Sequence, residues 1–143
     1  MVTIRSAEPH DAEQFVTLMA ALGYPTTAEI MAAKLRRVTQ SASDHVFAAI
    51  DGAVPIGCIG CHTMELLHVP GYVGRITVLV VASSHQRRGV GSLLVTAAER
   101  FFRSLGCVRI EVTSGSRRAD AHAFYGALGF ADTGRRFVRS LLS

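Results

Sequence analysis

Lysine is almost absent from this sequence of 143 residues, in which only Lys34 is a lysine among fifteen cationic residues. The formal net charge of +4 therefore rests on arginine, whose guanidinium group fits phosphate and carboxylate oxygens in pairs. This balance favours an anionic partner, either nucleic acid or a phosphorylated cofactor, although arginine also serves simply as a solvated surface residue. The arginines form scattered pairs, with no basic arm and no signature of a nucleic-acid-binding module. We therefore expect no nucleic-acid partner.

Long apolar runs are also missing, because charge, glycine or proline interrupts each one well before the roughly 18 residues that a membrane span needs. The segment Met1–Arg5 lacks the apolar core of a signal peptide. The three cysteines, Cys58, Cys61 and Cys107, give an odd count that suits a reducing compartment without a disulfide framework. These absences predict a cytoplasmic protein that does not associate with a membrane.

The organisation of the chain indicates one domain over residues 1–143. Apolar residues make up 49% of the sequence, with no repeat, linker or low-complexity segment. A chain of this length can bury roughly 70% of its unfolded surface in one core.

Apolar periodicity predicts the secondary structure. We expect strands at Val2–Ala7, His45–Ile50, Val54–Met64, Arg75–Val81 and Val108–Thr113, with a last strand from Phe130 onward that includes Phe137 and Leu141. We expect helices at Pro9–Leu22, Ala28–Val38, Val90–Leu105 and about Ala119–Leu128. The order βααβββαβαβ predicts an α+β fold with a mixed sheet and a strand-turn-helix at its centre.

The central strand-turn-helix carries the first chemical signal. Its strand stops at Ala82 and its helix starts near Gly89, so that unpaired helix amides point toward one place, as in sites that bind phosphate. Gly89 and Gly91 allow a ligand to approach the backbone, and Arg87 and Arg88 add positive charge. Taken alone, the pattern is weak, because glycines also serve plain tight turns.

A second segment gives this pattern its context. Gln86-Arg87-Arg88-Gly89-Val90-Gly91 is followed about 34 residues later by Phe124-Tyr125-Gly126-Ala127-Leu128-Gly129-Phe130. Together these segments closely resemble the two signatures of the GNAT acetyltransferase superfamily. The resemblance implies a GNAT-like, mostly antiparallel central sheet flanked by helices. It also implies an acetyl-CoA-dependent N-acetyltransferase, in which a primary amine of a small molecule or peptide attacks directly within a ternary complex.

The resemblance also implies roles for individual residues. Tyr125 matches the tyrosine that commonly protonates the departing thiolate; its alternative role is that of an aromatic packing residue. The residues expected to bind the cofactor are Leu79, Val80, Val81, Gln86, Arg87, Arg88, Gly89, Val90, Gly91, Ser92, Arg118, Ala121, Phe124 and Tyr125. The first three would bind the pantetheine arm through their backbone, near a bulge. Arg118 stands where many relatives carry an asparagine that contacts the cofactor, which puts that contact in doubt.

The proton acceptor is the other departure from the family pattern. Many relatives carry a glutamate as general base fourteen residues before the glycine that matches Gly89, and this sequence has Arg75 there. An aliphatic amine is almost wholly protonated at neutral pH, so some group or water chain must take its proton. The candidate bases are Glu111 and His122, followed by Glu65 and His62, although an ordinary surface or hydrogen-bonded role is the more common one for each of these side chains. Arg75 itself could pair with an acidic acceptor or with a structural carboxylate.

Three further expectations complete the sequence-based hypothesis. Cys58-Ile59-Gly60-Cys61-His62 has the form of a c-type haem attachment motif, but it alternates like a strand, and no second ligand pair completes a zinc site. We expect no metal. Dimerisation is common among members of the family, and the sequence does not decide it. The alternative function is a catalytically silent acyl-CoA-binding sensor or regulatory module.

Overall fold

A computed structural model describes residues 1–113, 119–133 and 137–142. The chain forms two compact units, Met1–Val112 and Thr113–Ser143. The assignment of residues 1–143 to one domain stays a prediction.

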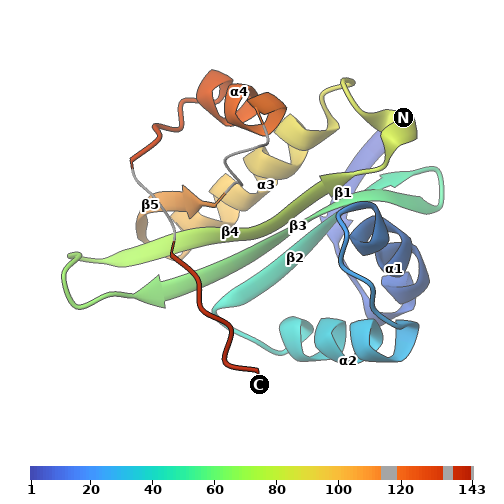
Figure 1. Ribbon diagram of the computed structural model, residues 1–143, viewed down its shortest axis with the longest axis horizontal. Helices are drawn as coiled ribbons and strands as arrows, with labels where there is room; N and C mark the ends of the chain where they lie inside the picture. The colour runs from blue at the N-terminus through green and yellow to red at the C-terminus, as the bar shows by residue number, and fades with distance from the viewer. Residues whose placement is uncertain (114–118, 134–136, 143) are drawn as a thin grey trace. The chain divides into compact units, whose positions relative to one another are not determined.

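The first unit contains a five-stranded sheet in the order β1-β2-β3-β4-β5, shown in Figure 1. All neighbours are antiparallel except β4 and β5, which are parallel. Its elements are β1 (Val2–Ser6), η1 (Pro9–Asp11), α1 (Ala12–Ala21), α2 (Ala28–Thr39), β2 (Asp44–Asp51), β3 (Val54–Glu65), β4 (Tyr72–Val81), η2 (Ser83–His85), α3 (Val90–Ser104) and β5 (Cys107–Val112). The structure thus confirms the mixed, mostly antiparallel α+β fold.

Local sequence signals explain the element ends. The Thr27 hydroxyl oxygen accepts a hydrogen bond from the Ile30 amide at 3.2 Å and so caps α2. Gly52 adopts a φ of 65° in the turn between β2 and β3, as the Asp-Gly pair predicts.

Helices cover both faces of the sheet. On one face, Phe15, Leu18 and Leu35 of α1 and α2 form a buried cluster that includes Cys58 of β3 and Val80 of β4. On the other face lies α3, whose Phe102 is fully buried close to Gly74. Because side chains alternate along a strand, residues two apart from Cys58 share the face of α1 and α2.

A bulge interrupts β4 at Thr77. Ile76 pairs with Cys61 and Val78 pairs with Gly60, which leaves Thr77 without a partner on β3. A Cβ on Gly60 would lie 2.5 Å from the Thr77 hydroxyl oxygen, so the missing side chain makes room for the extra residue. The bulge therefore precedes Leu79–Val81, the segment near which the resemblance placed it.

The second unit contains α4 (Ala119–Ala127), close to its expected bounds. Gly129 follows with a φ of 91°, and the Phe130 amide donates a hydrogen bond to the Tyr125 carbonyl at 3.0 Å. The ring of Tyr125 packs edge-on against Phe124 and Phe130, with ring centroids 5.2 and 5.6 Å apart.

The expected last strand is wrong for the described residues, since 130–133 and 137–142 form no strand. Phe137 and Leu141, which the expected strand includes, are 91% and 94% exposed. An apolar pattern marks which side chains could be buried together, but a strand forms only where another backbone edge accepts its hydrogen bonds.

Replacing Gly74 with alanine is expected to destabilise the protein by about 1–3 kcal/mol, the usual cost of overpacking a core. A Cβ on Gly74 would lie 2.5 Å from the Phe102 ring, and that ring has no exposed surface through which to yield. Urea unfolding of Gly74→Ala would measure the loss.

Gly126→Ala is the matched control, because a Cβ there meets nothing within 4 Å and the residue lies in α4. Alanine is the better helix former, so this variant is expected to be as stable as the parent or slightly more so. Equal midpoints for Gly74→Ala and the parent would contradict the packing described for α3.

Candidate active site

The edge of β4 is only partly paired. Its pairing with β5 ends where Ile76 meets Val112, whereas its pairing with β3 continues to Val81. Along the described chain, no strand therefore covers the other edge of β4 from Thr77 to Val81 (Figure 1). Such an edge offers backbone N–H and C=O groups to an extended ligand. The predicted residues Leu79, Val80 and Val81 lie on it.

The loop after β4 is anchored by hydrogen bonds from both sides. The Ala82 amide donates to the Ile56 carbonyl at 2.7 Å, and the Gln86 side chain donates to the Val81 carbonyl at 3.1 Å. These contacts fix the direction in which the chain leaves the sheet.

A His-Asp pair provides the longest-range anchor of this loop. His85 Nε2 lies 2.7 Å from Asp51 Oδ2, which belongs to the end of β2, and His85 Nδ1 lies 2.7 Å from the Ser84 hydroxyl. The hydrogen bond from His85 lowers the pKa of Asp51. The sequence analysis does not predict this pair, because no local pattern connects Asp51 with His85, which lies 34 residues further along the chain.

The start of α3 carries unpaired amides. The first intrahelical bond runs from the Leu93 amide to the Gly89 carbonyl at 3.1 Å, and no side chain caps the helix. The amides of Val90, Gly91 and Ser92 therefore have no acceptor within the helix.

The backbone before α3 has an unusual conformation. Gly89 has a φ of 80°, and Arg87 has a φ of 62°, a left-handed conformation that side chains other than glycine rarely adopt. A Cβ on Gly89 would meet nothing within 4 Å, so space remains open beside the amides. With the helix dipole and the exposed side chains of Arg87 and Arg88, this segment fits a diphosphate group such as that of CoA.

A polar row crosses the sheet beside the unpaired edge. Asp44 pairs in register with His62, His62 with Arg75, and Arg75 with Glu111, across strands β2 to β5. Because His62 lies four residues from Cys58, the row faces the side of the sheet that α1 and α2 cover.

Glu111 binds two arginines in this row. One Oε accepts from Arg75 at 3.0 Å, and the other accepts from Arg109 at 2.8 Å. The hydrogen bond from Arg75, together with the bonds and charge of Arg109, lowers the pKa of Glu111. A carboxylate held in this way is a weaker proton acceptor than a free one. Arg75 thus has a structural carboxylate partner.

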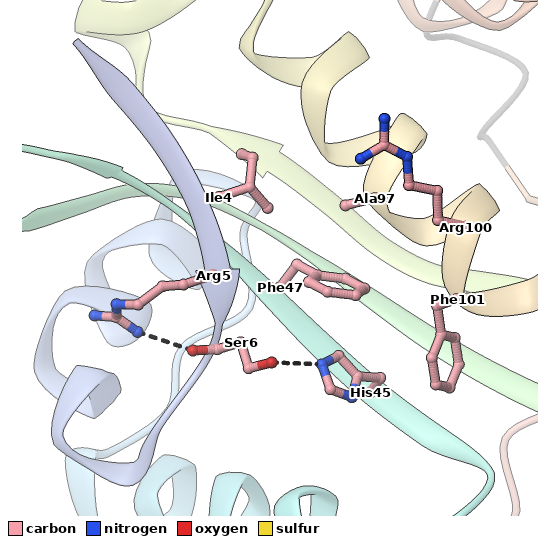
Figure 2. A pocket seen from close by; sticks show the side chains of 8 residues that line it. All are labelled: Ile4, Arg5, Ser6, His45, Phe47, Ala97, Arg100 and Phe101. Atoms are coloured by element: carbon pink, nitrogen blue, oxygen red, sulfur yellow. Dashed lines mark hydrogen bonds between the residues drawn. The ribbon is translucent and has the colours of Figure 1, made fainter. Parts of the chain in front are cut away.

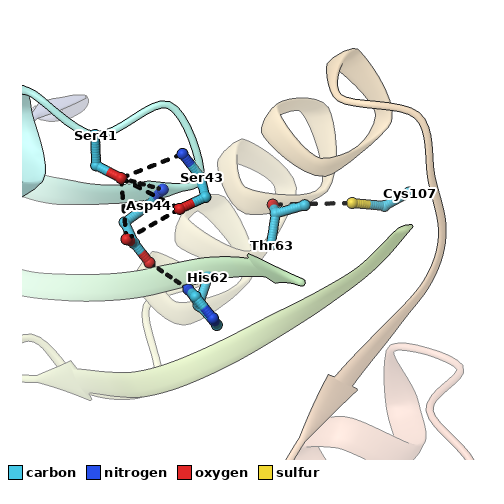
Figure 3. A network of polar contacts seen from close by, with 6 residues as sticks. All are labelled: Ser41, Ser43, Asp44, His62, Thr63 and Cys107. Carbon is cyan, nitrogen blue, oxygen red and sulfur yellow. Dashed lines mark hydrogen bonds and ion pairs between the residues drawn. The ribbon is translucent and has the colours of Figure 1, made fainter. Parts of the chain in front are cut away.

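His62 and Asp44 form the other half of the row. His62 Nδ1 is hydrogen-bonded to Asp44 Oδ1, while Ser41 and Ser43 donate to the second Asp44 oxygen at 3.0 and 3.3 Å (Figure 3). Burial alone would raise the pKa of Asp44, but the hydrogen bonds from His62 and Ser41 outweigh it and hold that pKa below its ordinary value.

The other predicted site residues lie in the second unit. Ala121, Phe124 and Tyr125 are half-buried on α4, and His122 is exposed there. Arg118 lies outside the described residues.

The two cysteines of the Cys-x-x-Cys-His segment point to opposite faces of the sheet, because Cys61 lies three positions after Cys58 and side chains alternate along a strand. Burial raises the pKa of Cys58 and of Cys61 to about 12, so neither thiol is a ready nucleophile or ligand. Within the described residues, no group of three His, Cys, Asp or Glu side chains could hold a metal ion. No helix in that part of the chain is long and apolar enough to cross a membrane.

A separate hollow of about 570 Å³ lies at the opposite side of the sheet, near β1 (Figure 2). Its lining comes from β1, β2 and α3: Ile4, Arg5, Ser6, His45, Phe47, Ala97, Arg100 and Phe101. No predicted site residue lines it.

Comparison with known proteins decides the family. The sequence model of the acetyltransferase (GNAT) family matches residues 13–130. This chain belongs to the GNAT family.

Two curated relatives are N-acetyltransferases. The aminoalkylphosphonate N-acetyltransferase of Salmonella typhimurium is 31% identical over 97 residues, which are 68% of this chain and 63% of that protein. The chain thus spans less than two thirds of that relative. The aminoglycoside N(6')-acetyltransferase type 1 of Stenotrophomonas maltophilia is 31% identical over an alignment of 145 positions, gaps included, which covers 93% of this GNAT chain and 88% of that protein.

Solved structures share the fold. A transcriptional regulator from Bacillus halodurans has a TM-score of 0.89 at 23% identity, covering 99% of this chain and 100% of the other. An aminoglycoside N-acetyltransferase in complex with CoA has a TM-score of 0.86 at 21% identity, covering 99% and 96% of the two chains.

Gly89→Ala is expected to weaken CoA binding by about tenfold or more, which corresponds to about 1.4 kcal/mol. The alanine side chain disfavours the positive φ and occupies the open space beside the helix amides. Isothermal titration with CoA would measure the change in Kd.

Gly106→Ala is a matched control at the other end of α3. Gly106 has a φ of 79° and likewise has nothing within 4 Å of a Cβ, so both variants carry similar backbone strain. CoA affinity that falls equally in both variants, or in neither, would remove the start of α3 from the phosphate site.

Proposed function

We propose that this GNAT chain is an acetyl-CoA-dependent N-acetyltransferase that moves an acetyl group to a primary amine of a small molecule or peptide. The observation that carries the proposal is the continuity of three backbone features: the unpaired edge of β4, the anchored loop and the uncapped start of α3. They suit an extended ligand that ends in a diphosphate. The two relatives named as N-acetyltransferases support the same chemistry.

Each feature has its own role in this proposal. Leu79–Val81 would hold the pantetheine arm through backbone hydrogen bonds, and the amides of Val90–Ser92 would hold the diphosphate with Gln86, Arg87 and Arg88 beside them. Bound acetyl-CoA would supply a thioester that carries the acetyl group. Arg118, Ala121, Phe124 and Tyr125 are the proposed cofactor residues of the second segment.

Tyr125 is the proposed proton donor to the departing thiol. Its half-buried ring is held by Phe124 and Phe130, so the phenol is carried by a side chain with restricted motion. A phenol can donate a proton to a thiolate as the carbon–sulfur bond breaks. The amine is proposed to attack directly, without an acyl-enzyme; Cys58 and Cys61, as buried thiols with raised pKa values, would be poor nucleophiles for such an intermediate.

The acceptor is proposed to be a small amine. Arg75 and Arg109 share the single carboxylate of Glu111, which leaves the cluster one positive charge in excess and favours an acceptor with an acidic group. The Salmonella relative, by its name an aminoalkylphosphonate N-acetyltransferase, fits such a class.

A panel of acceptors tests the proposal. Thiol release from acetyl-CoA is measured with an aminoalkylphosphonate, an aminoglycoside, amino acids and peptides, and at least one amine is expected to give turnover. Tight CoA binding without turnover on any acceptor would favour the alternative, a catalytically silent acyl-CoA-binding module.

Tyr125→Phe is expected to lower kcat by about 100-fold while changing the Kd for CoA by less than about threefold. Only the hydroxyl is removed, and it would act on the leaving thiolate and not on the bound ground state. Steady-state kinetics and CoA titration would separate the two effects.

Tyr24→Phe makes the same chemical change at an exposed loop position and serves as the control. If kcat of Tyr125→Phe stays at the parent value, Tyr125 has no part in proton transfer.

A further inference from the structure

The proposed reaction requires a proton acceptor, and the position that supplies a glutamate in many relatives holds Arg75. The Arg75 side chain is bonded to Glu111 at 3.0 Å, on the β5 side of the row. The residue that pairs with Arg75 on its other side is His62 of β3. His62 therefore lies on the strand next to Arg75, on the same face of the sheet.

Asp44 fixes the chemical form of His62. The lowered pKa of Asp44 keeps its carboxylate ionised, so that His62 Nδ1 donates the hydrogen bond that joins them. In the neutral imidazole, Nε2 then carries the free lone pair. The described part of the chain places no hydrogen-bond partner on Nε2.

The serines behind Asp44 restrain this arrangement. The Ser41 hydroxyl donates to Asp44 Oδ2, and the amides of Ser43 and Asp44 donate to the Ser41 hydroxyl oxygen at 3.2 and 3.1 Å (Figure 3). Asp44 is thus held in place from the loop that follows α2, while the His62 side chain remains 41% exposed. The imidazole is oriented and still accessible to a small molecule.

The row is level with the point on β4 at which the pairing with β5 ends. Arg75 directly precedes Ile76, the last β4 residue paired with β5, so His62 is level with the beginning of the unpaired edge. It also lies on the face covered by α1 and α2, the same face as Arg75 and Glu111, whose cluster with Arg109 is proposed to favour an acidic acceptor. The other carboxylate in the row, Glu111, is bound by two guanidinium groups and is the poorer acceptor.

We propose that His62, positioned by Asp44, accepts the proton of the acceptor amine in the acetyl transfer. This inference rests on the proposed function and assigns its missing base. Asp44 acts through His62 and is a positioning residue.

The proton balance of the step is complete. The ammonium group of the acceptor gives one proton to His62 Nε2, either directly or through one water, and the neutral amine forms the new nitrogen–carbon bond. The carbon–sulfur bond breaks, the Tyr125 phenol gives its proton to the departing thiolate, and the second proton lost by the nitrogen restores the phenol through solvent. His62 then returns its proton to solvent.

The charged groups of the row that face His62 are few. They are Asp44 on β2, which is hydrogen-bonded to His62, and Arg75 on β4, which pairs with His62 in register. Glu111 and Arg109 on β5 are one strand further away and bind each other. From the loop after α2, the nearest polar groups in the network are the uncharged hydroxyls of Ser41 and Ser43.

His62→Gln tests the inference. The variant is expected to lose at least about 100-fold in kcat/KM at pH 7 and to regain activity at high pH, where the amine is already neutral. The Kd for CoA should remain within about threefold of the parent, because His62 lies outside the phosphate site.

Asp44→Asn separates positioning from catalysis. We expect a smaller loss of kcat/KM than in His62→Gln, because the imidazole remains and only its orienting partner is lost, and the loss should likewise shrink at high pH. His45→Gln is the matched control: His45 lies beside Asp44 on β2 but faces α3, where it contacts Ser6 and Phe101. It should leave the pH profile unchanged.

The outcomes distinguish this inference from the proposed function. Parent turnover with the same rate and pH profile in His62→Gln would overturn the role of His62 and leave the acetyltransferase proposal intact. A parent without turnover on any acceptor would overturn both.

Discussion

The separation of β4 from β5 after Ile76 is the constraint on which the rest of this site depends. Up to that residue the two parallel strands satisfy one another's backbone groups, and beyond it β4 keeps only β3 as a partner. An uncovered segment of this kind offers its backbone N–H and C=O groups to an extended ligand. The bulge at Thr77, accommodated by Gly60, falls where the separation begins.

The polar side chains beside this edge form two groups with different chemistry. Arg75, Arg109 and Glu111 neutralise one another except for one positive charge, which suits binding of an anion and makes Glu111 a poor base. Asp44 and His62 instead leave one imidazole nitrogen without a described partner. With Arg75 at the β4 position, the proposed proton acceptor is His62 on the neighbouring strand β3.

Much of the fold follows from the sequence, because it depends on local signals. Thr27 caps a helix, Gly52 forms a turn, and the spacing from Val90 to Leu105 describes one amphipathic face. The last strand was wrong, because the apolar side chains of Phe137 and Leu141 contain no information about a partner edge.

The site shows the same limit. The glycine-rich segment could be found by its local pattern, whereas the His85–Asp51 and His62–Asp44 pairs join residues brought together only by strand register. Sequence spacing does not predict such pairs, so the sequence alone leaves His62 as one of several candidate bases, and the register of β2 with β3 places it opposite Asp44.

The most direct test of this account is a titration of the isotopically labelled protein with CoA, followed by amide chemical shifts. The account predicts that within the first unit the largest changes occur at the amides of Val78–Val81 and Val90–Ser92. Changes confined to the hollow beside His45 and Arg100, or no changes at all, would contradict it.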